Sequence, residues 1–129
     1  MKREDLIYKD ECYQIVGILF KVFKELGGNL LEKQYQKAIA VGFKMAGIRY
    51  TEQFPIKIHY ESKFIGIFYA DFLIELGQAK IILDIKKQEN FGEKNIKQVS
   101  DYLKNSHLKL GILANFTKSG VRYKRIVNL

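Results

Sequence analysis

The sequence predicts a mixed α/β fold with the element order α-α-β-β-β-α-β-(β), in which the final strand is optional. Apolar residues recur at helical spacing up to residue 46, and the segments that follow are rich in β-branched and aromatic residues. A later amphipathic segment predicts a helix that allows the next strand to run parallel to the preceding one. No repeat or linker interrupts the 129 residues, so we expect a single domain over residues 1–129.

Two helices joined by a short loop open the predicted fold. Residues 11–26 form the first helix, with Asp10 as its expected N-cap and Gly27-Gly28 as its stop. Residues 30–46 form the second helix, which ends at its expected C-cap, Gly47. The Gly-Gly-Asn connection is short enough to make the two helices a helical hairpin.

Three strands then form a predicted antiparallel meander over residues 49–60, 64–76 and 80–86. Pro55 lacks a backbone N–H, which indicates that the first strand lies at an edge of the sheet. The chain ends with a predicted helix and two predicted strands, over residues 93–106, 108–115 and 121–127. We therefore expect a mixed sheet flanked by helices.

Charge and composition narrow the range of functions. The chain carries 22 Lys and Arg against 14 Asp and Glu, a net charge of +8. Such a surplus favours nucleic acid as the partner, and a basic surface that only provides solubility is the alternative. No apolar run is long enough to span a membrane, and no signal-peptide core is present. The single Cys12 cannot form an intramolecular disulfide, so we expect a cytoplasmic protein without membrane association.

The segment ADFLIELGQAKIILDIK, residues 70–86, predicts a β-hairpin whose two-residue loop is Gly77-Gln78. A Gly-X loop is typical of a type II′ turn, because its first position needs a positive φ. The loop sets four cross-strand pairs: Leu76 with Ala79, Glu75 with Lys80, Asp71 with Asp84, and Tyr69 with Lys86. The pair of Glu75 and Lys80 supports this register, since opposite charges facing each other across a ladder are favourable.

Asp71, Asp84 and Lys86 share one face of the predicted hairpin, because strand side chains alternate between faces. Directly opposed Cβ atoms lie about 4.5–5.5 Å apart, so the two carboxylates can chelate one Mg²⁺ or a similar hard cation. Lys86, two residues along, can position or activate a water near that cation. The alternative is a solvated face on which Lys86 relieves the repulsion between two carboxylates.

Three further residues, Glu32, Gln98 and Tyr102, each allow two interpretations. Asn29 and Glu32 have the spacing of a capping box, yet Glu32 on the first turn of a helix covering the sheet can also reach the metal, directly or through water. Gln98 and Tyr102 are spaced i, i+4 at the margin of a buried helical face. This partly exposed amide and phenol either contact substrate phosphate or base, or are ordinary boundary residues.

Together these residues resemble the PD-(D/E)xK nuclease superfamily, which has a helical glutamate, an aspartate on the second strand, Asp-x-Lys on the third and a glutamine on the next helix. More closely, five segments resemble successive blocks of the small bacterial and archaeal GxxExxY proteins: LGGNLLEKQYQKA, YADFLIE, ILDIKK, QVSDYLK and LKLGILANF. The blocks come in the same order and extend over residues 26–127. This sequence departs from the family where Asn29 replaces a glycine, Ala70 a proline and Asp84 a glutamate.

The resemblance implies a restriction-endonuclease-like core and a set of catalytic residues: Glu32, Asp71, Asp84 and Lys86. The three carboxylates are the implied metal ligands, and the lysine is implied to orient the attacking water. Gln98, with Tyr102, matches the glutamine-tyrosine motif of the exonuclease-like branches and is implied to bind substrate.

The implied activity is hydrolysis of phosphodiester bonds, in DNA, with Mg²⁺ or Mn²⁺ as cofactor. The alternative is a catalytically inactive module that keeps the fold and binds nucleic acid or recruits a partner. Because so small a domain covers little duplex, a homodimer or a complex with a partner protein is also compatible with the sequence.

Overall fold

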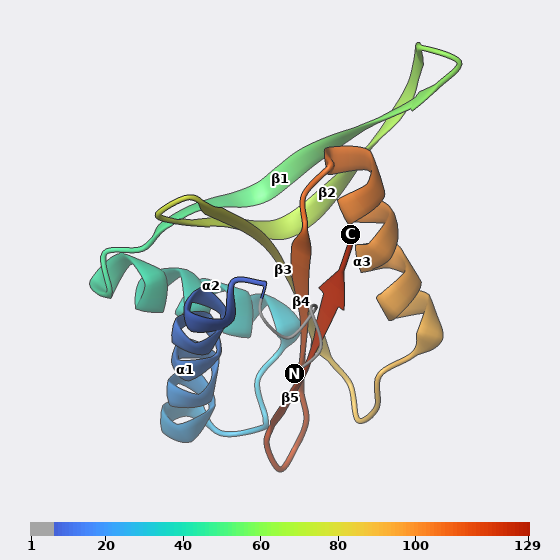
Figure 1. Ribbon diagram of the computed structural model, residues 1–129. Coiled ribbons are helices and arrows are strands. Elements are labelled where there is room, and N and C mark those ends of the chain that lie inside the picture. Colours follow the sequence, from blue (N-terminus) through green and yellow to red (C-terminus); the bar gives the residue numbers. More distant parts are fainter. Residues whose placement is uncertain (1–6) are drawn as a thin grey trace.

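The computed structural model describes residues 7–129 and arranges them in three layers (Figure 1). A five-stranded sheet with the order β1-β2-β3-β4-β5 forms the middle layer. Helices α1 (Lys9–Leu26) and α2 (Glu32–Met45) cover one face, and α3 (Glu93–Ser106) covers the other. The expected mixed α/β fold is confirmed, with each expected element present in the expected order.

The sheet is mixed, as the position of α3 between two strands predicts. Strands β1 (Arg49–Tyr60), β2 (Lys63–Leu76) and β3 (Ala79–Lys87) are antiparallel neighbours, β4 (Leu110–Phe116) runs parallel to β3, and β5 (Val121–Val127) is antiparallel to β4. Pro55 lies in the edge strand β1, as the sequence predicts. In residues 7–129 no helix is long and apolar enough to cross a membrane.

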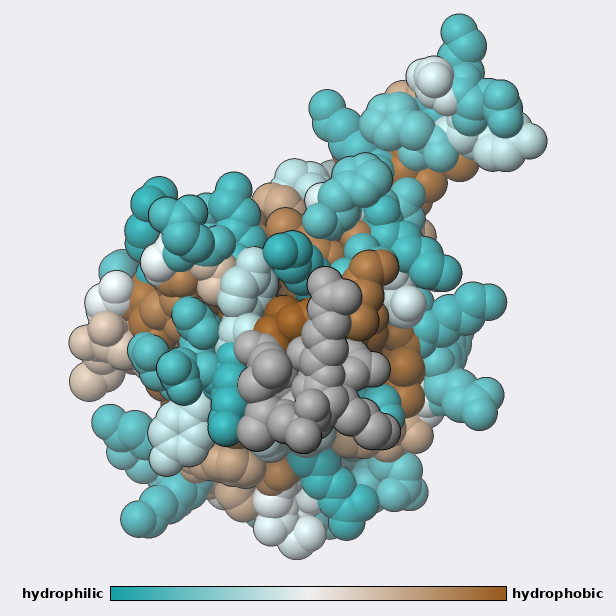
Figure 2. Space-filling model, viewed as in Figure 1, coloured by the Kyte–Doolittle hydropathy of each residue, from teal (hydrophilic) through white to brown (hydrophobic). Residues whose placement is uncertain are grey.

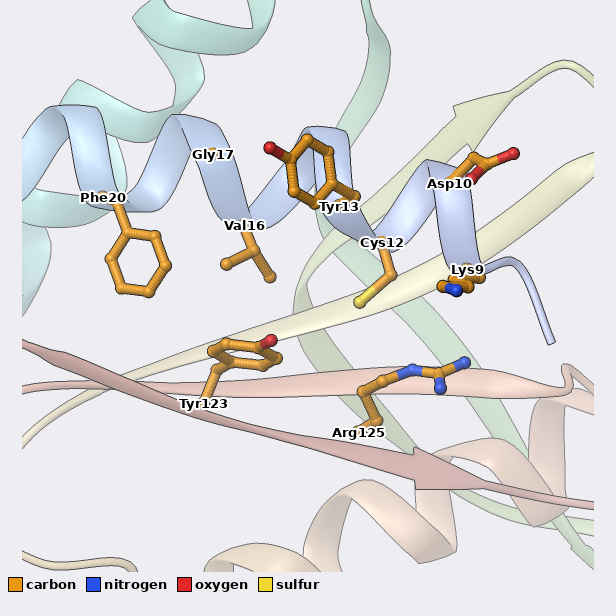
Figure 3. A pocket seen from close by; sticks show the side chains of 9 residues that line it. All are labelled: Lys9, Asp10, Cys12, Tyr13, Val16, Gly17, Phe20, Tyr123 and Arg125. Atoms are coloured by element: carbon orange, nitrogen blue, oxygen red, sulfur yellow. The ribbon is translucent and has the colours of Figure 1, made fainter. Parts of the chain in front are cut away.

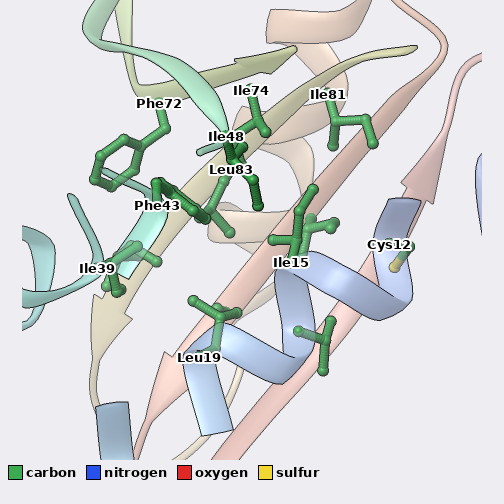
Figure 4. Packing of buried hydrophobic residues seen from close by; sticks show 14 of the residues in the cluster. Cys12, Ile15, Leu19, Ile39, Phe43, Ile48, Phe72, Ile74, Ile81 and Leu83 are labelled. Atoms are coloured by element: carbon green, nitrogen blue, oxygen red, sulfur yellow. The ribbon is translucent and has the colours of Figure 1, made fainter. Parts of the chain in front are cut away.

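The two faces of β3 pack against different helices. Ile81, Leu83 and Ile85 belong to the larger core, which Ile15 and Leu19 of α1 and Ile39 and Phe43 of α2 complete (Figure 4). Ile82 belongs to the smaller core under α3, with Val99, Tyr102 and Leu103. Because side chains alternate along a strand, Asp84 also projects to the α3 side. The predicted division of this strand into two faces is therefore confirmed.

The starts of both N-terminal helices differ from the prediction. Helix α1 begins at Lys9 with Tyr8 as its N-cap, so Asp10 lies in the first turn and does not cap the helix. Helix α2 begins at Glu32, and the N–H of its N-cap, Leu31, donates to Gln34 Oε1 at 2.9 Å. The capping box of Asn29 and Glu32, one of the two interpretations of this spacing, is therefore not formed.

The loop before α2 is organised by a side chain from inside the helix. The Tyr35 hydroxyl donates to the Gly27 carbonyl at 2.6 Å and accepts the Leu30 N–H at 3.3 Å. Its ring stacks on Phe116 of β4, with the ring centroids 4.3 Å apart. Because of these contacts, the N-cap of α2 lies two residues after the predicted one. The Glu32 carboxylate is then available to contact another part of the chain.

Candidate active site

The β2–β3 hairpin has the predicted loop and register. Gly77 has a φ of 58° and Gln78 does not have a positive φ, as a type II′ turn requires. Leu76 pairs with Ala79, and Glu75 with Lys80, whose Nζ lies 4.0 Å from Glu75 Oε1. Regular pairing continues as far as Phe72 with Leu83, and the ladder ends one position before the two aspartates.

Strand β2 leaves β3 at Asp71 and continues with β1 as a projecting hairpin (Figure 1). Gln53, between the paired residues of β1, has a left-handed φ of 51°, which marks the bend. The expected ladder pairs of Asp71 with Asp84 and of Tyr69 with Lys86 are therefore not formed. The aspartates still meet, but through their side chains.

The two carboxylates are fixed by reciprocal hydrogen bonds across the end of the ladder. Asp84 Oδ1 accepts the Asp71 N–H at 3.1 Å, and Asp71 Oδ2 accepts the Ile85 N–H at 2.7 Å. Each carboxylate thereby uses one oxygen to replace a missing ladder bond. Of the two other oxygens, Asp84 Oδ2 lies 3.5 Å from Lys86 Nζ. The predicted grouping of Asp71, Asp84 and Lys86 is therefore present.

Burial disfavours a negative charge on both carboxyl groups of this pair. The Asp84 side chain is almost fully enclosed. Burial raises the pKa of Asp71 to about 7, the charge of Asp84 raises it as well, and the Ile85 N–H and Lys86 oppose the shift. Burial also raises the pKa of Asp84, against the opposing effects of Lys86 and the Asp71 N–H. A cation between the carboxylates would favour their charged forms and so oppose both shifts.

Glu32 reaches the end of β3 from the first turn of α2. Its Oε1 accepts the Lys87 N–H at 3.2 Å, and its charge contributes to the raised pKa of Asp71. Within residues 7–129, however, no three His, Cys, Asp or Glu side chains stand close enough together to form a metal site. The two aspartate carboxylates therefore lie close together, and the Glu32 carboxylate lies at the edge of this pair.

Tyr102 of α3 lies deeper than its sequence position suggests. Its side chain is 3% exposed, and its ring packs on Phe68 of β2 with the centroids 5.3 Å apart. Burial raises the pKa of its hydroxyl, the charges of Asp84 and Asp71 raise it further, and the neighbouring Gln98 opposes the shift. The expectation of a partly exposed phenol is wrong, because this side of α3 faces the sheet. Gln98 is partly exposed, as expected.

The sequence interpretation misses one buried polar residue beside the site, Asn115. It pairs with Lys86 in the parallel register of β3 and β4, and its Oδ1 accepts the Gln88 N–H at 3.1 Å. Gln88 Nε2 in turn donates to Asn95 Oδ1 at 2.7 Å, which ties the end of β3 to the first turn of α3. In the described part of the chain Asn115 Nδ2 has no acceptor. The available signal was an asparagine in the otherwise apolar strand LGILANF.

Two pockets of about 550 Å³ flank α1, and neither is lined by the candidate site residues. One lies between α1 and β5, where Cys12, Phe20, Tyr123 and Arg125 converge (Figure 3). Burial raises the pKa of the Cys12 thiol, and the adjacent Arg125 guanidinium opposes that shift. The other pocket lies between α1 and α2. The candidate site at the end of the β2–β3 ladder is therefore separate from both pockets.

The model of the PD-(D/E)XK nuclease superfamily matches residues 9–126. The chain belongs to this superfamily. Asp71 of this PD-(D/E)XK protein lies on β2, and Asp84 and Lys86 lie on β3, the strands on which the resemblance implies the motif residues. The assignment of the motif to these three residues stays a prediction. The narrower GxxExxY assignment stays a prediction.

Two solved structures resemble this PD-(D/E)XK protein in fold. The crystal structure of SSO0001 aligns with a TM-score of 0.59 and 16% identity, over 74% of this chain and 49% of that one. This chain therefore spans about half the length of that protein. The structure of Archaeoglobus fulgidus Hjc, a Holliday junction resolvase from an archaeal hyperthermophile, aligns with a TM-score of 0.47 and 10% identity, over 74% of this chain and 71% of that one. No curated protein matches the sequence significantly.

Proposed function

We propose that this PD-(D/E)XK protein hydrolyses phosphodiester bonds in DNA with a divalent cation, Mg²⁺ or Mn²⁺, held by Asp71 and Asp84. The observation that carries the proposal is the reciprocal hydrogen bonding of two carboxylates beside Lys86, of which Asp84 is buried and Asp71 half-buried. Two buried like charges are unfavourable unless a positive group compensates them. A single lysine 3.5 Å from one oxygen compensates only part of this charge.

The donor set fits such a cation. Mg²⁺ prefers oxygen ligands and is usually held by one or two carboxylates, with waters and substrate phosphates completing its shell. Asp71 and Asp84 each keep one oxygen that accepts no backbone N–H in residues 7–129, which provides two such ligands. Glu32 is suited to hold a water of the shell, because it lies at the margin of the pair and its Oε1 accepts the Lys87 N–H.

The residues around the carboxylates have separate roles in the proposed reaction. The bound ion supplies Lewis-acid polarisation of a phosphoryl oxygen and lowers the pKa of a bound water. Lys86 orients the attacking water and stabilises the developing negative charge. The Tyr102 hydroxyl is protonated at neutral pH, as an ordinary tyrosine is, and burial raises its pKa further, so it can donate a hydrogen bond. Gln98, beside it, holds the substrate strand through its amide.

A second candidate function has one observation in its favour. Each aspartate accepts a backbone N–H of the opposite strand, so the pair has a structural use even without a metal. The alternative is therefore an inactive module that keeps the fold and binds nucleic acid or recruits a partner. Carboxylates beside bound phosphates disfavour it, because they repel the ligand that the basic surface attracts.

A nuclease assay separates the two candidates. Single-stranded DNA, duplex DNA and RNA are incubated with Mg²⁺, Mn²⁺ or EDTA and with wild type, Asp84→Asn or Glu75→Gln. Glu75 is an acidic residue of the same hairpin that pairs with Arg49 and Lys80, outside the site. We expect metal-dependent cleavage of DNA that falls about a thousandfold in Asp84→Asn, since metal catalysis contributes several kcal/mol, and that persists in Glu75→Gln. Equal activity of Asp84→Asn and wild type would contradict the proposal.

A further inference from the structure

The outer part of the β1–β2 hairpin, residues 57–67, projects beyond the three layers, and we call it the arm (Figures 1 and 2). Helix α3 covers only the inner part of the hairpin, where Ile56 and Phe68 belong to the smaller core. The tip at Glu61 and Ser62 lies roughly 15 Å beyond this covered part, at the usual rise per strand residue. The arm is therefore free of the rest of the molecule on both faces.

One face of the hairpin, opposite the face that α3 covers, combines aromatic and basic side chains along its outer length. Three cross-strand pairs form it, which we call the arm face: Pro55 with Tyr69, Lys57 with Ile67, and His59 with Phe64. The first strand contributes every second residue, so all six side chains share this face. Tyr69 is 55% exposed and Phe64 56% exposed, and the His59 and Phe64 rings meet edge to face at 6.0 Å. In the described part of the chain, the Phe64 ring has an aromatic contact with His59 of the same hairpin, and the Tyr69 ring has none.

The composition of the arm face fits nucleic acid better than a second copy of the chain. It contains Lys57 and His59 and no acidic residue, and the whole chain carries a net charge of +8. Two arm faces packed together would bring like charges into contact. A stable protein interface also uses about 20–30 residues a side, far more than six. Aromatic side chains beside lysines are, in contrast, what proteins use to bind single strands, because every base has a face that stacks.

We propose that the arm face binds unpaired bases of the DNA strand on which the carboxylate site acts. Tyr69 and Phe64 stack with bases, and Lys57 binds backbone phosphate. Tyr69 precedes Asp71 by two residues on the same strand, so the arm face begins beside the carboxylate site along β2. It lies on the opposite side of the sheet from the one to which Asp84 projects, so a DNA strand stacked on the arm face passes the edge of the hairpin to reach the carboxylates. The inference rests on the proposed function, since it names the substrate class as DNA with single-stranded segments.

Binding in EDTA tests the arm without cleavage. Fluorescence anisotropy measures the affinity for fluorescein-labelled dT20 and for a 20-base-pair duplex. Phe64→Leu and Tyr69→Leu remove a ring and keep apolar bulk, and Phe64→Tyr and Tyr69→Phe keep a ring. Tyr13→Leu removes a ring that is 82% exposed on α1, and it is the matched control. We expect each ring-removing variant to weaken dT20 binding roughly five- to a hundredfold. The ring-keeping variants and Tyr13→Leu should bind like wild type, and the duplex affinity should change little.

Several results would overturn the arm proposal. Wild type that does not bind dT20, or ring-removing variants that bind it normally, would exclude stacking on the arm. Equal losses in Phe64→Tyr and Phe64→Leu, at an unchanged melting temperature, would exclude it as well. A wild-type dimer in sedimentation that Phe64→Leu dissociates, with dT20 binding unchanged, would make the arm face a subunit interface.

The nuclease assay separates this inference from the proposed function. A protein that cuts DNA and whose arm variants bind dT20 normally would refute the arm alone. A protein that never cuts DNA, but whose ring-removing variants lose dT20 binding, would refute the nuclease and leave the arm as a single-strand binding element.

Discussion

At the scale of single residues, the raised pKa of Asp71 follows from the way the hairpin ends. The Asp71 carboxylate sits beside that of Asp84 where the ladder stops, and Asp84 is buried while Asp71 is half-buried. The backbone N–H groups that they accept lower the pKa of both carboxyls without reversing the effect of burial. The metal-free protein therefore carries an electrostatic penalty that depends on pH.

This penalty predicts the direction of a stability change. The folded-state pKa of Asp71 is about 7, whereas an unfolded aspartate titrates near 3.9. Between these values the folded protein holds a proton that the unfolded chain has lost, so the free energy of unfolding should fall as pH rises from about 4 to 7. Urea denaturation in EDTA at pH 5 and pH 8 measures the change. Asp71→Asn should lose less free energy of unfolding between pH 5 and pH 8 than wild type does. Equal losses in the two proteins would contradict the titration of Asp71 as the cause.

Lys86 should act on turnover and not on metal binding. Its Nζ pairs with Asp84 Oδ2, but an ammonium cannot be a ligand of a cation. Lys86→Ala should retain the stabilisation by Mg²⁺ in a melting experiment and lose about a hundred- to a thousandfold in cleavage rate. A Lys86→Ala protein with wild-type cleavage, free of contaminating nuclease, would refute the proposed role of this lysine.

Sequence reasoning could reach Asp71, Asp84 and Lys86 because their meeting depends on a local signal, the Gly77-Gln78 loop. It could not find Asn115, whose importance comes from a parallel strand far away in the sequence. It also could not predict the side-chain hydrogen bonds of the aspartates. These hydrogen bonds depend on the bend of β2. At the same bend, Gln53 of the neighbouring strand β1 has a left-handed φ of 51°.

At the scale of elements, strands were easier to predict than helix starts. β1 and β5 have the predicted bounds, and so does α3, because periodicity and turn residues define them locally. The start of α2 depends on the contacts of Tyr35 with the loop and with Phe116, which no local pattern reveals. The position of Glu32 is a consequence of that contact.

The Tyr35 hydroxyl should therefore contribute measurably to stability. Tyr35→Phe keeps the stack on Phe116 and removes two hydrogen bonds to the loop, leaving the Gly27 carbonyl and the Leu30 N–H without this partner. We expect a loss of about 1–3 kcal/mol in the free energy of unfolding, measured in urea. Tyr50→Phe is the control, because the Tyr50 hydroxyl makes no hydrogen bond within residues 7–129. Losses of equal size in the two variants would contradict the role of the Tyr35 hydroxyl.

At the scale of the whole molecule, the net charge of +8 predicts salt-dependent binding to DNA. Each phosphate neutralised by a cation contributes about −0.9 to the slope of log K against log salt on duplex DNA. Contacts with three or more phosphates therefore predict a slope of about −3 or steeper, with little dependence on base sequence. A titration over NaCl concentrations in EDTA measures the slope. A value near zero would show that the basic residues do not bind the backbone.

The proposed cation site lies at a junction of the whole fold. The carboxylate pair lies at the point where β2 leaves the body of the sheet for the arm and where β3 ends. Asp84→Asn keeps the shape, and its amide oxygen can still accept the Asp71 N–H while one of the two charges is lost. The stability of this variant therefore separates a metal site from a structural pair.

Four melting curves test the metal site most directly: wild type and Asp84→Asn, each in EDTA and with Mg²⁺ or Mn²⁺. In EDTA the variant should melt at the wild-type temperature or above it, because it relieves a repulsion. The cation should stabilise wild type by about 1–3 kcal/mol at ten- to a hundredfold its Kd, and the variant by much less. A variant that is clearly less stable than wild type in EDTA, together with a wild type that responds to neither ion, would contradict the metal site.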